Sequence, residues 1–239
     1  MVLPRVLHLL MICGLLASTA AAQVPLRGRV EGTRYVSPTG EFSLTIPVLP
    51  ELGGTISDTP NVVTFQDQFN LHASIACFPM DATQRWESET RGRRDYLVWF
   101  FGNFVQSDFA ARFPGSQIES AKFFGTFLGG SLLVYNLLPG GSMFEHRIVV
   151  TSAEDRPVAK RGNLLFVHAE HVYVLSTELA ERVTERHLYD KSVEEQNEIL
   201  QRRLFDLVAR MTFADELPAP TGAGPTPPAN AAPGAPPES

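Results

Sequence analysis

The sequence predicts an α+β protein, a three-layer α/β/α sandwich in which two long helices cover a central antiparallel sheet. Many short segments alternate apolar and polar residues with the period of a strand, whereas two long segments carry apolar residues with the period of a helix. Short turns rich in glycine and proline separate consecutive strand segments, which favours antiparallel neighbours. The predicted order is three strands, a helix, five strands and a helix. Two amphipathic helices before and after a meander can cover a twisted antiparallel sheet.

The first strand is predicted by Phe42, Leu44 and Ile46, which alternate with polar residues after a turn at residues 37–40. Two more strands follow at residues 62–65 and 71–78. The period then changes to that of a helix over residues 84–112, which ends before a Pro-Gly pair. The predicted apolar face of this helix consists of Leu97, Phe100, Phe101, Phe104 and Val105.

Trp99 falls on the opposite side of this helix from the apolar face. It therefore either faces solvent or contacts another element. We take Trp99 as a candidate ligand-binding or partner-binding residue, with an ordinary surface side chain as the alternative.

The second half of the chain predicts a meander and a closing helix. The five strands are expected at residues 117–127, 131–138, 143–152, 163–168 and 172–177, with turns at Gly129-Gly130, Pro139-Gly140-Gly141 and Arg161-Gly162. Ser192 followed by Glu195 is a capping-box pattern and predicts the start of the last helix. One face of that helix is lined by Val193, Leu200, Leu204, Leu207, Val208 and Met211.

The two ends of the chain predict segments outside the folded domain. Residues 1–22 have the layout of a cleaved signal peptide, with Arg5, an apolar stretch and a run of small residues before Gln23. Residues 215–239 are rich in proline, alanine and glycine and predict a disordered tail. The domain is therefore expected at residues 30–214 of a periplasmic or secreted bacterial protein, with no transmembrane segment in the mature chain.

Charge and cysteine content exclude two kinds of protein. The formal net charge is −6 at pH 7, and the signal peptide carries one cation, Arg5, and no acidic residue. A mature chain this acidic lacks the basic surface that nucleic-acid binding needs, so we expect no nucleic-acid partner.

Signal cleavage removes Cys13 and leaves Cys77 alone, so no internal disulfide can form. Cys77 is interpreted as a small buried side chain, with a reactive thiol or an intermolecular bridge as the alternatives.

The segment YVSPTGEFSLTIP, residues 35–47, resembles the opening of PsbP-like domains, and the order of elements is similar over about residues 33–213. This resemblance implies an α/β/α sandwich with an antiparallel sheet. Members of the family include extrinsic proteins of photosystem assembly, a nuclear import factor that binds a small GTPase, and exported bacterial proteins. Their common theme is binding and assembly, and no catalytic residue set comes with the family.

The only cluster of metal-ligand residue types that stands out is His168-Ala169-Glu170-His171. If Ala169-Glu170 is a two-residue hairpin loop, His168 and His171 form a cross-strand pair with Cβ atoms about 5 Å apart. Two ligands are too few for a zinc site, and Glu170 would have to fold back to supply a third. Ala-Glu is also a poor type I′ loop, so a longer loop that separates the histidines is the alternative. Phosphate-binding loops and nucleophile motifs are absent from the sequence, and no cofactor is expected.

These observations favour an exported, non-enzymatic binding or assembly factor of PsbP-like type. Its partner is expected to be a protein or a small ligand in the periplasm. The first alternative is a metal-dependent enzyme that uses His168, Glu170 and His171. The second is a carrier of a small apolar ligand, suggested by the 16 phenylalanines of the chain.

Overall fold

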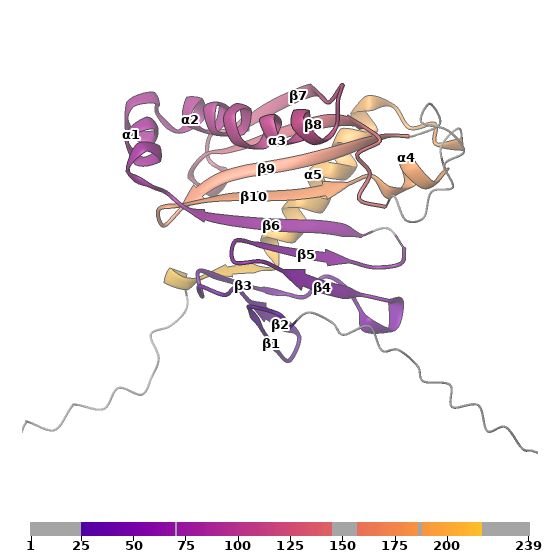
Figure 1. The fold of residues 1–239 in the computed structure, drawn as a ribbon, viewed down its shortest axis with the longest axis horizontal. Helices are drawn as coiled ribbons and strands as arrows, with labels where there is room; N and C mark the ends of the chain where they lie inside the picture. Colours follow the sequence, from indigo (N-terminus) through magenta and orange to yellow (C-terminus); the bar gives the residue numbers. More distant parts are fainter. Residues whose placement is uncertain (1–24, 70, 145–156, 186–187, 217–239) are drawn as a thin grey trace, which may run out of the picture.

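The computed structural model describes residues 25–69, 71–144, 157–185 and 188–216, and within them the chain forms two antiparallel sheets. The central sheet has the strand order β4-β5-β6-β10-β9-β8-β7, and a smaller sheet of order β1-β2-β3-β11 lies below it in Figure 1. The central strands are β4 (Thr55–Asp58), β5 (Val62–Gln66), β6 (His72–Pro79), β7 (Gln117–Phe124), β8 (Ser131–Pro139), β9 (Val158–His168) and β10 (His171–Glu178). The smaller sheet contains β1 (Arg29–Glu31), β2 (Arg34–Val36), β3 (Phe42–Thr45) and β11 (Met211–Phe213).

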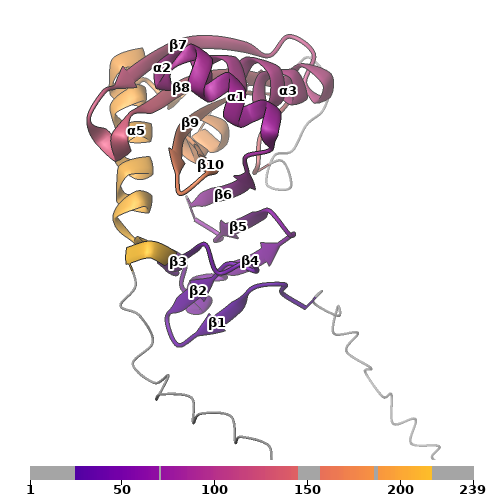
Figure 2. The same cartoon turned by 90° about the vertical axis from the view of Figure 1, so that its left-hand side faces the viewer.

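Helices cover both faces of the central sheet, as Figure 2 shows, with α1, α2 and α3 on one side and α5 on the other. The α-helices are α1 (Ala82–Arg91), α2 (Arg93–Phe100), α3 (Ser107–Arg112), α4 (Ala180–Glu185) and α5 (Val193–Ala209), and a π-helix, η2 (Phe101–Gln106), joins α2 to α3. Short 3-10 turns are η1 (Pro50–Leu52), η3 (Phe127–Gly129) and η7 (Ala214–Glu216). The predicted fold class, α+β with helices on both sides of an antiparallel sheet, is confirmed.

The period of two along the strands divides the core between the two faces. Leu133, Leu164 and Leu175 are fully buried in the cluster that also contains Leu200 and Leu204 of α5. Their neighbours along the same strands belong to a second cluster with α2 and η2, whose members include Leu132, Leu165, Val174, Leu97 and Phe101. The central strands are therefore apolar on both sides, as expected of a sheet between two helical layers.

Helix α5 begins as the sequence predicts. The Ser192 hydroxyl accepts a hydrogen bond from the Glu195 amide, and the Glu195 carboxylate accepts one from the Ser192 amide, which is a complete capping box. The helix ends earlier than predicted, because Met211 leaves it and pairs with Leu44 as the first residue of β11.

The turn predicted at Arg161-Gly162 is wrong, because both residues lie inside β9. A Cβ at Gly162 would lie 3.0 Å from Leu204 Cδ1 and 3.2 Å from Leu200 Cβ. Gly162 therefore lets α5 pack closely on the sheet, since a glycine inside a strand leaves room for the close approach of another element.

The predicted first helix is interrupted. Gly92 has a φ of 77° and separates α1 from α2, and the wider π turn of η2 follows α2. The strand predicted at residues 143–152 lies largely outside the described residues, as do the predicted signal peptide and nearly all of the predicted tail. In the described part of the chain, no helix is both long and apolar enough to cross a membrane.

Candidate functional site

The histidine cluster is a tight hairpin tip. Strand β9 ends at His168, β10 begins at His171, and these two residues are directly paired. Ala169 and Glu170 have φ values of 43° and 60°, so both loop residues adopt the left-handed conformation of a type I′ turn. The two-residue loop, rather than the longer alternative, is therefore the one that forms.

The two histidines have different partners. His168 Nε2 lies 2.8 Å from Asp215 Oδ1, and the His168 ring stacks on Phe213 at 4.1 Å. His171 Nδ1 lies 2.8 Å from the Ala169 carbonyl oxygen. The hydrogen bond with His168 is the main cause of a lowered pKa at the Asp215 carboxyl.

Glu170 points to the other side of the tip. Its carboxylate lies 3.8 Å from Arg85 Nη1, and its carbonyl oxygen accepts a hydrogen bond from the Met80 amide. Within the described residues, no group of three or more His, Cys, Asp and Glu side chains is arranged to hold a metal ion. His168, Glu170 and His171 as a metal site therefore stay a prediction from the sequence alone.

Trp99 lies half-buried among other rings. Its ring centroid is 5.8 Å from that of Tyr96 and 5.6 Å from that of Phe104, and the Arg91 guanidinium lies 5.6 Å from it. Trp99 thus contacts its own helical segment, and its role in binding stays a prediction. Its neighbour Phe104 lines the largest hollow described below.

An apolar groove of about 540 Å³ runs between the helices α1–α3 and the central sheet. Val62, Ala76, Phe78, Pro79, Val174 and Ser176 of the sheet line one wall, and Gln84, Phe100, Phe104, Val105, Asp108, Phe109 and Arg112 of the helices line the other. Phe104 is 47% exposed, so the groove is open to solvent. Its volume lies in the range of ligand sites, and its lining of aromatic and aliphatic side chains with a few polar groups is typical of them.

Polar groups are sparse in the groove. At its rim, Arg112 Nη2 lies 2.8 Å from Asp108 Oδ1, an exposed pair one helical turn apart. Gln84 Oε1 is buried and accepts no hydrogen bond from the described residues. The Ser176 hydroxyl donates a hydrogen bond at 2.7 Å to Asn163 Oδ1, on its cross-strand partner in β9.

That hydrogen bond begins a buried polar ladder under the helical wall. Asn163 Nδ2 donates to Asn136 Oδ1 at 3.0 Å, and Asn136 Nδ2 donates to Gln106 Oε1 at 2.6 Å. Asn136 and Asn163 are fully buried, so each of these hydrogen bonds satisfies a group that water cannot reach. The ladder joins strands β10, β9 and β8 to the last residue of η2, and it holds the π-helix at a fixed position over the sheet.

A buried ion pair continues the same face of the sheet. Arg161 and Glu178 are cross-strand partners, with Arg161 Nε 3.3 Å from Glu178 Oε2. Burial raises the pKa of Glu178 although Arg161 opposes the shift, and the Met143 amide and Ser142 hydroxyl also donate to this carboxylate. Neither Arg161 nor Glu178 lines the groove, although the Arg161 guanidinium lies 5.6 Å from the ring of Phe109, which does.

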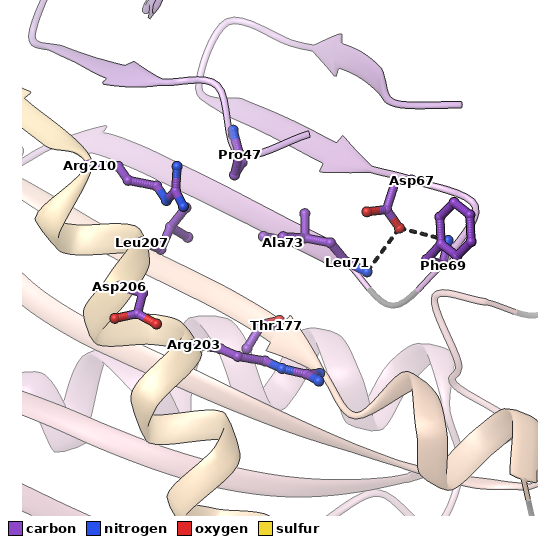
Figure 3. Close-up of a pocket in the computed structure, with 10 residues that line it drawn as sticks. All are labelled: Pro47, Asp67, Phe69, Leu71, Ala73, Thr177, Arg203, Asp206, Leu207 and Arg210. Atoms are coloured by element: carbon purple, nitrogen blue, oxygen red, sulfur yellow. Dashed lines mark hydrogen bonds between the residues drawn. The ribbon is translucent and has the colours of Figure 1, made fainter. Parts of the chain in front are cut away.

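A second hollow of about 300 Å³ lies on the opposite face, between α5 and the β5–β6 turn (Figure 3). Its charged groups are of both signs, with Arg203 and Asp206 on α5, Arg210 directly after that helix, and Asp67 across from them. Arg203 donates to the Glu178 carbonyl oxygen at 3.2 Å and to Glu181 Oε1 at 2.5 Å. Arg203 thus links α5 to β10 and α4, and Asp67 accepts hydrogen bonds from the amides of Phe69 and Leu71 in its own turn. Charges of both signs line this hollow, so the apolar groove is the stronger candidate site.

No protein-family model and no curated protein matches the chain. Among solved structures, the cyanobacterial PsbP (CyanoP) of Synechocystis sp. is similar with a TM-score of 0.42 and 11% identity, over 84% of this chain and 99% of that chain. The Ran-binding protein Mog1p of Saccharomyces cerevisiae is similar with a TM-score of 0.43 and 6% identity, over 80% of this chain and 97% of that chain. A PsbP structure is thus among the similar folds, and no functional property is transferred from these proteins to this chain.

Sequence reasoning missed the groove and the ladder beneath it. The apolar helix face that it found supplies Phe100, Phe104 and Val105, but the sheet residues of the groove come from three separate strands. The signal for the ladder was present, because Asn136 interrupts the otherwise apolar run of residues 131–138. A polar residue inside such a run predicts a buried hydrogen-bond partner, without naming that partner.

Proposed function

We propose that this protein is an exported, non-enzymatic binding protein whose groove holds an extended apolar segment of a protein partner. The observation that carries the proposal is the 540 Å³ groove between η2 and the sheet. Phe100, Phe104 and Phe109 line its helical wall, and Phe104 is 47% exposed. An open groove fits a peptide segment better than it encloses a small molecule.

The surroundings of the groove support binding rather than catalysis. Its polar side chains are few, and the buried ones that lie beneath it, such as Asn136 and Asn163, are satisfied by one another. A general acid or base must reach a bound substrate with a suitable pKa. Among the described residues that line the groove, Asp108 is the only one with a carboxylate, and it lies at the rim beside Arg112. The groove therefore offers contact area and shape more than reactive groups.

Export is the second part of the proposal and rests on residues 1–22. If the signal peptide is cleaved, protein isolated from the periplasm begins at or near Gln23. N-terminal sequencing of the protein from its native host checks this, and a chain that still carries Arg5 would contradict it.

The binding proposal is tested with a random peptide-display library selected on the full-length protein. We expect enrichment of apolar peptides, whose affinity is then measured by fluorescence anisotropy. Phe104→Gln should weaken them about tenfold, because a central aromatic contact contributes about 1–2 kcal/mol. Val98→Gln is the matched control, since Val98 is 52% exposed on α2 but does not line the groove.

Two outcomes would overturn the proposal. One is enrichment of peptides that bind the Phe104→Gln variant as tightly as the parent protein, which would place their site elsewhere. The other is binding of the apolar dye N-phenyl-1-naphthylamine in the groove without any peptide enrichment. That result would support the alternative, a carrier of a small apolar ligand.

A further inference from the structure

The described chain ends at Glu216, on the α5 face of the central sheet, whereas the groove lies on the opposite face. Asp215, close to the last described residue, contacts His168 on one side of the β9–β10 tip. On the other side of the same tip, Glu170 contacts Met80 and Arg85 at the start of α1. The neighbouring residues Pro79 and Gln84 line the groove, so the exit point and the groove are anchored to one hairpin tip.

The sequence of residues 217–239 suits an extended, apolar ligand. It carries prolines at 218, 220, 225, 227, 228, 233, 236 and 237, and its only ionisable side chain is that of Glu238. Pro225 and Pro228 form one P-x-x-P pair, and Pro233 and Pro236 form another. In a polyproline II helix, which has three residues per turn, both prolines of such a pair lie on the same side.

The groove has the chemistry and length to receive such a segment. Grooves lined by aromatic side chains are the usual partners of polyproline II segments. Phe78, Phe100, Phe104 and Phe109 line this groove, and Phe104 is 47% exposed. The helical wall from Phe100 to Arg112 is about 18 Å long at 1.5 Å per residue. About six residues of polyproline II, at 3.1 Å each, cover that length, which is one P-x-x-P pair with its flanking residues.

The connection is long enough to reach the groove. Pro225 is nine residues beyond Glu216, and nine extended residues span about 28 Å. The hairpin tip around which the chain must pass is only two strands wide, with strands about 5 Å apart.

We propose that the segment 217–239 occupies the groove of its own chain through a P-x-x-P pair and competes there with the partner segment. This inference rests on the proposed function of the groove. A short tether gives an effective concentration in the millimolar range, so the attached segment outcompetes the same segment of a second molecule at micromolar protein. With an intrinsic affinity near 1 mM and an effective concentration near 10 mM, the groove would bind its partner about tenfold more weakly.

The first test uses a nitroxide on the mature protein, which begins at Gln23 and lacks Cys13, at Asn230→Cys between the two P-x-x-P pairs. Cys77 is buried and its thiol pKa is raised to about 11 by burial, so it should not take up the label. We expect the label to broaden the amide signals of residues 100–112 on the groove wall and to spare the exposed face of α5. Broadening within one molecule does not change when the protein is diluted. Broadening that disappears on dilution would show that the segment binds only other molecules, and it would overturn the proposal.

The matched variant keeps the length of the segment but replaces Pro225, Pro228, Pro233 and Pro236 with glycine. It should lose the broadening and bind the groove-selected peptides, or N-phenyl-1-naphthylamine, about tenfold more tightly than the parent protein. A control variant changes Pro218 and Pro220 to glycine and should behave like the parent. Equal binding by the four-glycine variant and the parent, without broadening, would overturn this inference and leave the proposed function intact. If neither form binds a peptide or the dye, the proposed function fails as well.

Discussion

At the scale of single residues, the β9–β10 tip shows how context overrides a local preference. Ala169-Glu170 is a poor pair for a type I′ turn, because non-glycine residues are strained at positive φ. Both residues nevertheless have a positive φ in the structure. The tip is held from one side by Phe213 and Asp215 and from the other by Met80. These contacts come from distant parts of the chain, so the sequence around the tip could not predict the loop.

The same contacts change the expected cost of removing the histidines. A solvated tip would tolerate His168→Ala with a loss of less than about 0.5 kcal/mol, as exposed positions usually do. The His168 ring instead packs on Phe213, and its Nε2 contacts Asp215. We therefore expect His168→Ala to lower the free energy of unfolding by more than an exposed substitution does. The lost contacts with Phe213 and Asp215 would explain that loss without a metal.

Asp58 gives a pH-dependent prediction, because it joins the two sheets. Its carboxylate accepts hydrogen bonds from the amides of Arg27 and Gly28 and from the Tyr35 hydroxyl, at 2.7–2.8 Å. Partial burial alone would raise the pKa of Asp58, but these hydrogen bonds outweigh it and lower the pKa. Asp58→Asn should destabilise the protein by about 1–2 kcal/mol at pH 7, since hydrogen bonds to a charged group are lost.

The sign of the pH effect follows from the lowered pKa. A carboxylate with a lower pKa in the folded state stabilises the fold above its unfolded pKa, near 3.9, and that contribution disappears as the pH falls through the folded pKa. Urea unfolding between pH 7 and pH 2.5 should therefore show the gap between the parent and Asp58→Asn closing below about pH 4. A gap that stays constant with pH would show that lost packing, rather than charge, causes it.

At the scale of elements, the sequence was informative wherever the signal is local. The Ser192–Glu195 capping box depends on neighbouring residues and is present in the structure. Strand β3 also forms where the alternation predicts it, but Ser43 is buried together with Phe42 and Leu44. The sequence does not predict the interruption at Gly92, because an isolated glycine inside a helical pattern is tolerated and does not mark a helix end. The sequence predicts a turn at Gly162, because the residues that require a glycine there, Leu200 and Leu204, lie about 40 residues further along the chain.

The π-helix η2 depends on contacts that the sequence does not display. Gln106 at its end accepts a hydrogen bond from Asn136, which belongs to the buried ladder across three strands. Gln106→Leu removes that acceptor and leaves the buried Asn136 amide unsatisfied. We expect a loss of about 1–3 kcal/mol in the free energy of unfolding, measured by urea titration.

The control for this change is Asn103→Ala in the same π-helix. The Asn103 side chain is exposed and donates only to the Trp99 carbonyl oxygen of its own helical segment. Its removal should cost less than about 0.5 kcal/mol. If the two variants lose equal stability, the ladder does not hold η2 to the sheet. Gln106→Leu should also weaken peptide binding in the groove, because the helical wall would lose its fixed position.

At the scale of the whole molecule, the groove exists because the helical layer does not cover the whole face of the central sheet. Helix α2 contacts β8, while the same face of β5 and β6 remains beside the groove. The fold class could be predicted from periodicity alone, but the offset between layers could not. It is set by packing choices such as Phe101 and Leu97 against Leu132 and Leu165, which no single segment encodes.

The last prediction concerns the role of the C-terminal segment in stability. All core residues of the described domain lie between Tyr35 and Phe213, so a chain that ends at Glu216 keeps its complete core and should fold. Tenfold competition by a docked segment corresponds to about 1.4 kcal/mol of stabilisation. For a domain of this size, removal of the segment should therefore lower the thermal midpoint by about 3–6 °C. Calorimetry of the full-length and shortened proteins measures the difference. An unchanged midpoint would argue against docking in the groove, whereas a much larger drop would show that the segment is part of the core.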